Sequence, residues 1–480
     1  MEGKESIRSH VAPGEGGDPA STPRIAFKKL WPLFLGKFTL PLTYAYSAVN
    51  IVFISNLIWP GDDYHALDIG VYYGIGIFMV AFSGLLFGYL ADRHSRVKLL
   101  AVITLGTGFA LVLDGFVPAG LRTVTYAIFL GIYLVRQFFD GGAAPVSNSY
   151  IDDASSEEKR SQVTGIGQAL WQLAWLSGVI ISGFVFEHYW RSYFWIFGAF
   201  TITMGVLLFK GKEPKRGATK NELKSILKIE GTTYDYKLTA ETLKSTVFSR
   251  TNIIAMVEGV MSQILNAVPM LLVFAYAQDK YNFSPSIMSL ITVCFGIPGA
   301  LIGTTAFSSL SDKLGKKNLK NRIYFIFSSI VVMYVIYMCY FLVPLKDVSG
   351  QDFFKVLTSF NNWIMCLALF GAQLVWGLFI INQTPLLQKI NLPEAQGAIG
   401  SANQFLEMIG HATGGILSGV LLNIFNNNYQ VTMCLLVITG LFGATLWLFA
   451  LKWVNKDAER VSGILQSRAK DMEANSRGEV

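Results

Sequence analysis

The charged residues of this chain are confined to short clusters, and apolar runs of about twenty or more residues separate the clusters. A bilayer core about 30 Å thick takes roughly 20 helical residues to cross, so each run is long enough for one crossing. The runs contain glycine and do not alternate with period two, which indicates helices rather than the strands of a barrel. The sequence therefore predicts an all-α integral membrane protein with twelve spans, at about residues 30–59, 68–91, 98–118, 122–150, 160–186, 189–210, 252–278, 284–309, 322–345, 361–388, 397–424 and 429–452.

Composition supports this class and excludes others. The 480 residues are 52% hydrophobic and only 15% charged, as in a polytopic membrane protein. The net charge of +7 comes from Lys and Arg beside the predicted spans, where the positive-inside rule accounts for them, so no nucleic-acid partner is predicted. The four cysteines fall inside predicted spans and are interpreted as small apolar residues rather than a metal site. No cofactor is expected.

One long polar insertion divides the chain. We expect a disordered tail, a six-helix bundle, a linker, a second six-helix bundle and a C-terminal tail, over residues 1–29, 30–210, 211–251, 252–453 and 454–480. Within the linker, "NELKSILKI" is compatible with a surface helix or with a solvated segment. Basic residues are dense in the linker, in alternate loops and near both termini, so a multi-pass topology with both termini cytoplasmic is predicted, in a host membrane that the sequence leaves open.

The two halves share a repeat. A shift of 220 residues superposes "FGYLADRHSRVK" on "FSSLSDKLGKKN", which places Asp92 on Asp312, Arg93 on Lys313 and Arg96 on Lys316. An internal repeat of six helices is typical of a pseudo-symmetric transporter whose halves rock about a central site.

These residues carry a family resemblance. Gly88, Leu90, Asp92, Arg93 and Arg96 resemble the G-x-L-x-D-R-x-G-R/K signature of the major facilitator superfamily, although Ser95 stands where the pattern has glycine. The resemblance implies that Asp92 is a latch closing the cytoplasmic side in one conformation and that the neighbouring arginines support it. The alternative is that the basic residues only set the membrane topology. This explains Arg93 and Arg96 but does not explain why Asp92 and Gly88 accompany them.

A second gating pair is a weaker match. Asp153 and Arg160 are spaced like the superfamily's acidic residue and arginine after the fourth helix, but ordinary surface charges explain them equally well. The complete gating set is Gly88, Asp92, Arg93, Arg96, Asp312, Lys313, Lys316, Asp153 and Arg160. The stretch "RQFFDGGAAPVSNSYIDD" also bears a faint similarity to spinster-like carriers, which leaves a lipid or lysolipid transporter as an alternative.

Ionisable side chains at membrane depth are costly, so each is a candidate functional residue. Arg136 and Asp140 lie four apart in the fourth span, and a purely structural salt bridge is the alternative. Glu258 shares a helix face with Asn266, and Glu407 precedes His411 by four residues. These groups either exchange a proton or hold helices together by hydrogen bonds.

Two further ionisable residues, Lys37 and Asp114, lie near predicted helix ends and are expected at the membrane interface.

The candidate substrate-binding or coupling set is Tyr46, Asn50, Arg136, Asp140, Gln168, Gln172, Glu258, Asn266, Gln373, Gln383, Glu407 and His411. The resemblance implies that spans 1, 4, 7 and 10 line the cavity, which favours Asp140 and Glu258 over Glu407 as coupling groups. A deep arginine with amides and aromatics suits a small polar or amphipathic organic solute, and an anionic one is an option because Arg binds carboxylate or phosphate through paired hydrogen bonds. Proton coupling is left open.

Among function classes, an alternating-access transporter is preferred to an enzyme, because one intramembrane histidine without a nucleophile–base or metal constellation argues against lipid chemistry. A non-transporting nutrient receptor on the same fold is an alternative. The expected partners are a small-molecule substrate and the lipid bilayer, and a monomer is expected.

Overall fold

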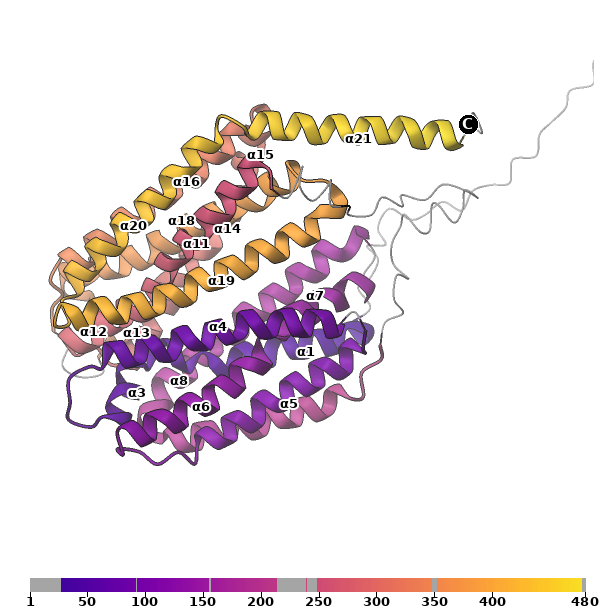
Figure 1. The fold of residues 1–480 in the computed structure, drawn as a ribbon. Helices are drawn as coiled ribbons and strands as arrows, with labels where there is room; N and C mark the ends of the chain where they lie inside the picture. The colour runs from indigo at the N-terminus through magenta and orange to yellow at the C-terminus, as the bar shows by residue number, and fades with distance from the viewer. Residues whose placement is uncertain are drawn as a thin grey trace, which may run out of the picture.

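A computed structural model of the protein describes residues 27–91, 93–154, 157–213, 239, 248–347 and 352–476. Within these ranges the regular structure is helical and contains no strand. Figure 1 shows long helices running side by side, with the N-terminal half of the chain in one group and the C-terminal half in another. This arrangement confirms the predicted fold class of two six-helix bundles.

The N-terminal bundle contains the first six spans. The first of them is bent by 71° between residues 49 and 51, and the fourth is interrupted at Gly141 and Gly142. The long helix α8 holds the fifth and sixth spans, which meet at non-helical Tyr189. The helices are α1 (Phe27–Tyr44), α2 (Tyr46–Val49), α3 (Ile51–Ile58), α4 (Ala66–Ala91), α5 (Arg96–Asp114), α6 (Thr123–Asp140), α7 (Ala143–Ala154) and α8 (Glu157–Leu208).

The C-terminal bundle has the other six spans, two of which contain a π-helical turn, and three additional helices. The elements are α11 (Arg250–Val268), η2 (Pro269–Val273), α12 (Phe274–Tyr281), α13 (Pro285–Ile291), η3 (Thr292–Gly296), α14 (Ile297–Thr305), α15 (Ser308–Lys317), α16 (Lys320–Leu342), α17 (Phe353–Leu357), α18 (Phe360–Lys389), α19 (Pro393–Ile424), α20 (Tyr429–Ala450) and α21 (Val454–Ser476).

By length and apolar composition alone, nine helices of the described chain could cross a membrane, or ten when the bent first span is included. The two further predicted spans are the second part of α8 and the interrupted pair α6–α7. Large apolar side chains such as Phe116 and Ile438 are exposed on the outer surface, as expected where lipid replaces water. The chain is an integral multi-pass membrane protein.

Short polar signals set the helix boundaries. The Ser95 hydroxyl accepts a hydrogen bond from the Lys98 amide at 3.3 Å and caps α5. Ser284 caps α13 in the same way, with Pro285 in the first turn. Asn282 ends α12 in the left-handed conformation, with φ of 54°. These devices place the chain reversals at the ends of the spans.

The bundle has two ends. We call them the linker end (near residues 91, 93–96, 154, 157, 208–213, 248–250, 305–320 and 389–393) and the far end (near residues 58–66, 114–123, 281–285, 342–347, 352–360 and 424–429). The two halves meet toward the far end, where α4 lies along α19 (Figure 1). A Cβ on Gly70 would lie 2.6 Å from the carbonyl oxygen of Gly415, and one on Gly419 would lie 2.5 Å from that of Ala66. Small residues therefore let the two backbones touch.

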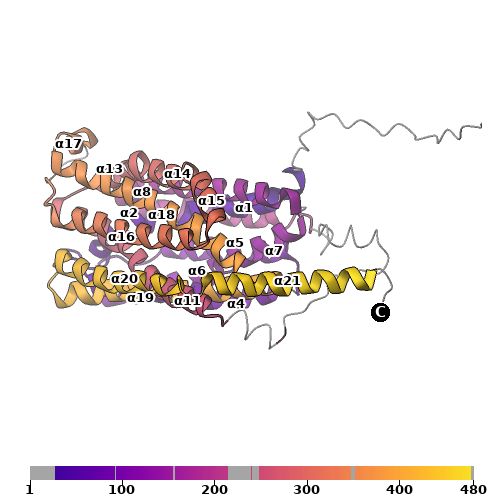
Figure 2. The same cartoon turned by 90° about the horizontal axis from the view of Figure 1, so that it is seen from above.

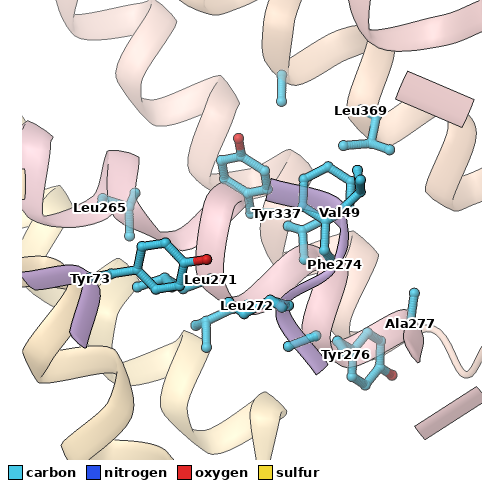
Figure 3. Close-up of a cluster of buried hydrophobic side chains, with 14 of the residues drawn as sticks. Val49, Tyr73, Leu265, Leu271, Leu272, Phe274, Tyr276, Ala277, Tyr337 and Leu369 are labelled. Carbon is cyan, nitrogen blue, oxygen red and sulfur yellow. The ribbon is translucent and has the colours of Figure 1, made fainter. Parts of the chain in front are cut away.

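Two other contacts join the halves near the far end. The Ser289 hydroxyl of α13 donates to the Val179 carbonyl of α8 at 2.9 Å. The Gln278 amide of α12 donates to the Val49 carbonyl at 2.6 Å. Figure 3 shows Val49 beside Phe274 and Tyr337 of the C-terminal bundle. We call these contacts, with the α4–α19 glycines, the far-end seal.

The C-terminal segment forms the helix α21, which extends beyond the bundle in Figure 2. Its Asp457 carboxylate accepts hydrogen bonds from the amide and hydroxyl of Thr251, at 3.3 and 2.6 Å. Val461 packs against Leu392, which precedes α19, and Ala395 of α19. The start of α21 is thus attached to the bundle. Most of the linker, including "NELKSILKI", and nearly all of the N-terminal tail lie outside the described residues.

Candidate functional site

A cavity of about 530 Å³ lies between the two halves, on the linker side of the far-end seal. α1, α2, α4, α5, α6, α7 and α8 line it from the N-terminal bundle, and α11 and α19 line it from the C-terminal bundle. Its charged or titratable lining residues are Lys37, Arg136, Asp140, Glu407 and His411, and its aromatic ones are Tyr44, Tyr73, Tyr133 and Trp171. The site is concave, mixed in polarity and shared by both halves.

Arg136 is held by a network in the N-terminal bundle. Its side chain is only 1% exposed, and its Nη1 donates to the Tyr46 hydroxyl at 2.7 Å. The same nitrogen lies 3.5 Å from a carboxylate oxygen of Asp114. Tyr46 and Tyr133 present their rings to the guanidinium, with its carbon 5.2 and 5.0 Å from the ring centres. Arg136 therefore reaches the cavity from a fixed position.

Asp114 corrects a sequence-based expectation. We expected it at the membrane interface, but its side chain is fully buried and forms the ion pair with Arg136. The sequence placed it at a helix end, which is right, yet the helices around it cover that end. Lys37, also expected at the interface, lines the cavity instead.

Asp140 lies on the cavity wall and accepts a hydrogen bond from the Thr107 hydroxyl at 2.8 Å. The ion pair of Arg136 in the described chain is therefore with Asp114, not with the residue four positions along its own helix. Asp140 is left to face the cavity beside Arg136.

The opposite wall carries a carboxyl group among amides. Glu407 accepts a hydrogen bond from the Asn403 amide at 2.6 Å and a longer one from the Gln383 amide at 3.5 Å. His411 and Asn266 line the same wall. Glu407, Asn266, His411 and, through its hydrogen bond, Gln383 are thus brought together.

Other predicted site residues lie away from the cavity lining. Glu258 is fully buried and bonded to the Ser262 hydroxyl. Asn50 is buried at the bend of the first span, where it donates to the Tyr46 carbonyl at 3.0 Å. Gln168 and Gln172 are exposed on α8, and Gln373 is half-buried on α18. Tyr46 acts behind the lining, through Arg136.

Three residues of the first copy of the repeated turn, Arg96, Gly88 and Arg93, have defined neighbours at the linker end. Arg96 is 4% exposed, and its Nε donates to the Ser149 hydroxyl at 3.2 Å. Gly88 lies against Pro145, and Arg93 lies over the Tyr89 ring at 4.1 Å. Lys313 is exposed on α15.

The remaining gating residues are outside what the structure describes. Asp92 is not among the described residues, and the side chains of Asp153, Arg160, Asp312 and Lys316 are likewise not described.

Sequence reasoning missed Glu213. Its carboxylate accepts hydrogen bonds from the Ser95 hydroxyl at 2.5 Å and from the amides of Arg96 and Val97 at 3.0 Å each, and it pairs with the Arg96 guanidinium at 3.3 Å. Partial burial raises the pKa of Glu213, but these hydrogen bonds outweigh it and hold the pKa below its usual value. The signal was a single carboxylate in the basic stretch "GKEPKR" just after the sixth span.

Twelve spans in two repeated bundles around a central cavity define a multi-pass protein with the architecture of a membrane transporter. A family model described as Major Facilitator Superfamily matches residues 34–415, and the chain belongs to that superfamily. No curated protein matches the sequence.

Several solved structures share the fold. A crystal structure of a bacterial homologue of the human lysosomal transporter Spinster, inward-facing and unoccupied, matches with a TM-score of 0.69 at 15% identity, over 90% of this chain and 99% of that chain. The nucleoside transporter NupG matches with a TM-score of 0.61 at 14% identity, over 89% and 100%. A D-xylose–proton symporter matches with a TM-score of 0.60 at 14% identity, over 88% and 95%. At such identities these likenesses concern the fold alone.

Proposed function

We propose that the protein is an alternating-access transporter of a small polar or amphipathic organic solute. The observation that carries this proposal is the cavity between the two halves, which the far-end seal covers on one side only. A cavity between two repeated bundles reaches the other side when the bundles rock, since the contacts of one end separate as those of the other form. The solved structures that share the fold are described as transporters, which supports the same class.

The lining supports an amphipathic solute. Lys37 and Arg136 offer donors for an anionic group, and the aromatic rings of Tyr73, Tyr133 and Trp171 offer apolar contact area. A lipid or lysolipid substrate is the second candidate. It is favoured by the mostly apolar, aromatic lining of the cavity.

Proton coupling is part of the proposal. Asp140 and Glu407 line opposite walls, so rocking changes the surroundings of both. A coupling group must differ in proton affinity between the two states, because a proton that binds both states equally does not shift the equilibrium between them. Glu258 remains a candidate, but its protons would reach the cavity only through other groups.

Orientation and gating complete the proposed mechanism. We place both termini and the linker in the cytoplasm, following the basic residues, so that the described conformation is open inward. Asp92 is proposed as the cytoplasmic latch, with Arg93 and Arg96 as supports and the second copy at Asp312, Lys313 and Lys316 acting in the same way. We expect a monomer, because each chain carries both walls of the cavity.

The test is counterflow in proteoliposomes against a library of nucleosides, sugars, organic acids and lysophospholipids. We expect saturable exchange of one class, and expect Arg136→Lys to weaken it because Lys lacks the planar pair of donors. Gln172→Ala, on the exposed face of α8, is the matched control and should transport normally. Binding without exchange by correctly inserted protein would favour a receptor and overturn the transport proposal.

A further inference from the structure

The first span bends at Asn50. α2 ends at Val49 and α3 begins at Ile51, and the span is bent by 71° between them. The backbone hydrogen bonds resume beyond the bend, where the Asn50 carbonyl accepts the Ile54 amide at 2.9 Å. A straight helix pairs each carbonyl with the amide four residues on, and within a membrane a carbonyl that loses this partner must find another in the protein. The bend therefore makes carbonyl groups available to side chains.

Two side chains donate to carbonyl groups just before the bend. The Tyr73 hydroxyl of α4 donates to the Ser47 carbonyl at 2.8 Å, within the N-terminal bundle. The buried Gln278 amide of α12 donates to the Val49 carbonyl at 2.6 Å, from the other bundle. Figure 3 shows Val49 beside Phe274 of α12, the helix that carries Gln278. The bent backbone is thus bonded to both halves of the protein.

The seventh span has an irregular turn at the matching place. A shift of 220 residues carries Val49 onto Pro269, the first residue of the π-helical turn η2. There the Val273 carbonyl accepts a hydrogen bond from the Tyr340 hydroxyl at 2.8 Å, within the C-terminal bundle. A tyrosine thus secures the irregular backbone inside each half. The Gln278 bond differs, because it joins the bend of one half to a helix of the other.

The bend also buries one polar atom at a cost. Asn50 is fully buried, and its amide nitrogen donates to the Tyr46 carbonyl at 3.0 Å. Its Oδ1 has no hydrogen-bond partner in the part of the chain that the structure describes. A buried acceptor without a hydrogen bond lowers the stability of the conformation that buries it. The bent conformation therefore depends on compensating contacts, and the Gln278 bond lies at the adjacent residue.

We propose that Gln278 is a gating residue of the far end, whose hydrogen bond to Val49 holds the bend of the first span and the closed seal together. When the halves separate, Gln278 moves away with the C-terminal bundle, and the Val49 carbonyl becomes available to the Phe53 amide, four residues on, as in a straight helix. Bend and seal then form one two-state element. This inference rests on the proposed alternation of the two ends, and Gln278 acts from outside the described cavity lining.

The experiment measures cysteine labelling of the full-length protein in detergent, with its four cysteines replaced by alanine. One reporter is Ser418→Cys, because Ser418 of α19 is 1% exposed beside the contact with α4. The other is Ala144→Cys, because Ala144 of α7 is exposed in the central cavity. Opening of the far end should uncover the first position without uncovering the second. Labelling needs no substrate, so a failure of this inference is distinguishable from a failure of the counterflow assay.

Gln278→Met removes the donor and keeps the length of the side chain. We expect labelling at the Ser418 position to rise about two- to ten-fold, the effect of one net hydrogen bond on the equilibrium, with no rise at the Ala144 position. The matched control is Gln430→Met, because Gln430 donates to the Tyr276 hydroxyl at 3.2 Å within one half, and it should label as the parent does. Parental labelling in Gln278→Met, or an equal rise at both positions, would overturn the gating role.

Gln278→Glu gives a second readout that a general loss of packing would not move. An ionised carboxylate cannot donate to the Val49 carbonyl, whereas a protonated carboxyl group can. We therefore expect this variant to label like Gln278→Met at about pH 8 and to approach the parent as the pH is lowered to about 5, since burial favours the protonated form. If the ratio of labelling between the Glu and Met variants is the same at both pH values, the hydrogen bond does not hold the far end closed.

Discussion

The two walls of the central cavity treat charge in different ways. On the N-terminal wall, Arg136 is paired with Asp114, and Asp140 lies beside it with a hydrogen bond from Thr107. On the C-terminal wall, Glu407 is surrounded by the amides of Asn403 and Gln383, and no described cation pairs with it. One wall balances buried charges against each other, and the other solvates a carboxyl group with neutral dipoles.

The difference separates two roles. An ion pair in which both partners are buried is costly to break, because removal of one partner leaves the other as an unpaired buried charge. A carboxyl group held by amides accepts a proton without leaving a buried counter-ion behind. We therefore interpret the N-terminal wall as a fixed substrate-binding surface and the C-terminal wall as the one whose charge changes during the cycle.

The largest effect is expected from the paired wall. Arg136→Gln leaves Asp114 buried and unpaired, which should lower the free energy of unfolding by about 3–5 kcal/mol. The measurement is the melting temperature of detergent-purified protein, together with the yield of monodisperse protein. Adding Asp114→Asn should restore much of the loss. If the Arg136→Gln variant alone were as stable as the parent, the ion pair between Arg136 and Asp114 would not stabilise this wall of the cavity.

The next effect concerns transport rather than stability. Glu407→Gln keeps the hydrogen-bonding shape of the side chain, so we expect a small change in stability but loss of accumulation driven by a pH gradient, with counterflow at equal pH retained. Asp140→Asn, Glu258→Gln and His411→Ala are measured beside it, and Glu258→Gln, away from the lining, should have the least effect on coupling. If all four variants accumulate substrate fully, proton coupling through these groups is excluded and a uniporter is the better account.

A third variant tests whether the glycine contact between α4 and α19 holds the far-end seal closed. Gly419→Val places a side chain against the Ala66 carbonyl and should prevent closure of the far-end seal. Accessibility labelling of single cysteines on the far-end loops should then increase several-fold relative to the parent. Gly131→Ala, whose Cβ would have no atom within 4 Å, is the control. Unchanged labelling in Gly419→Val would mean that the glycine contact does not hold the seal.

The smallest effect is expected at the linker end, outside both walls. Glu213→Gln should lower stability at neutral pH by about 0.5–1 kcal/mol, reduced by solvent screening because the carboxylate is one-third exposed. The folded pKa of Glu213 lies below its unfolded value, so its stabilisation is present above the unfolded value and is lost as the pH falls through the folded one. The melting temperatures of variant and parent should therefore differ at pH 7 and converge only as the pH falls below the folded pKa of Glu213. A difference that persists at low pH would assign the effect to packing.

The fold was predictable from the sequence because each span is independently long and apolar. The spacing of the charge clusters predicted twelve spans in an all-α membrane fold, and the long polar insertion predicted two bundles of six, in agreement with the observed fold class. Boundaries within spans were not predictable, because the break at Gly141 and the π turns of η2 and η3 depend on neighbouring helices rather than on local composition.

The candidate site was predictable in part. Four of the predicted residues line the cavity: Arg136, Asp140, Glu407 and His411. The sequence pointed to them because an ionisable side chain at membrane depth is energetically costly and is therefore a candidate functional residue. The partner of Arg136 was not found, because the helical spacing pointed to Asp140 while Asp114 comes from another helix, 22 residues away in the chain. Gln168 and Gln172 were expected in the site but lie on the exposed face of α8. The sequence could not show this, because the polarity of a residue does not tell which face of its helix meets the cavity.

The glycine contacts between α4 and α19 have a consequence for the entropy of closure. Ordering a long side chain at an interface costs up to about 2 kcal/mol in lost rotamers, whereas glycine has none to lose. Because backbone meets backbone at Gly70, Gly415 and Gly419, this part of the interface forms without freezing side chains. At these glycines the closure of the two helices therefore carries little rotamer cost, and the backbone surfaces can separate and rejoin without reordering side chains there.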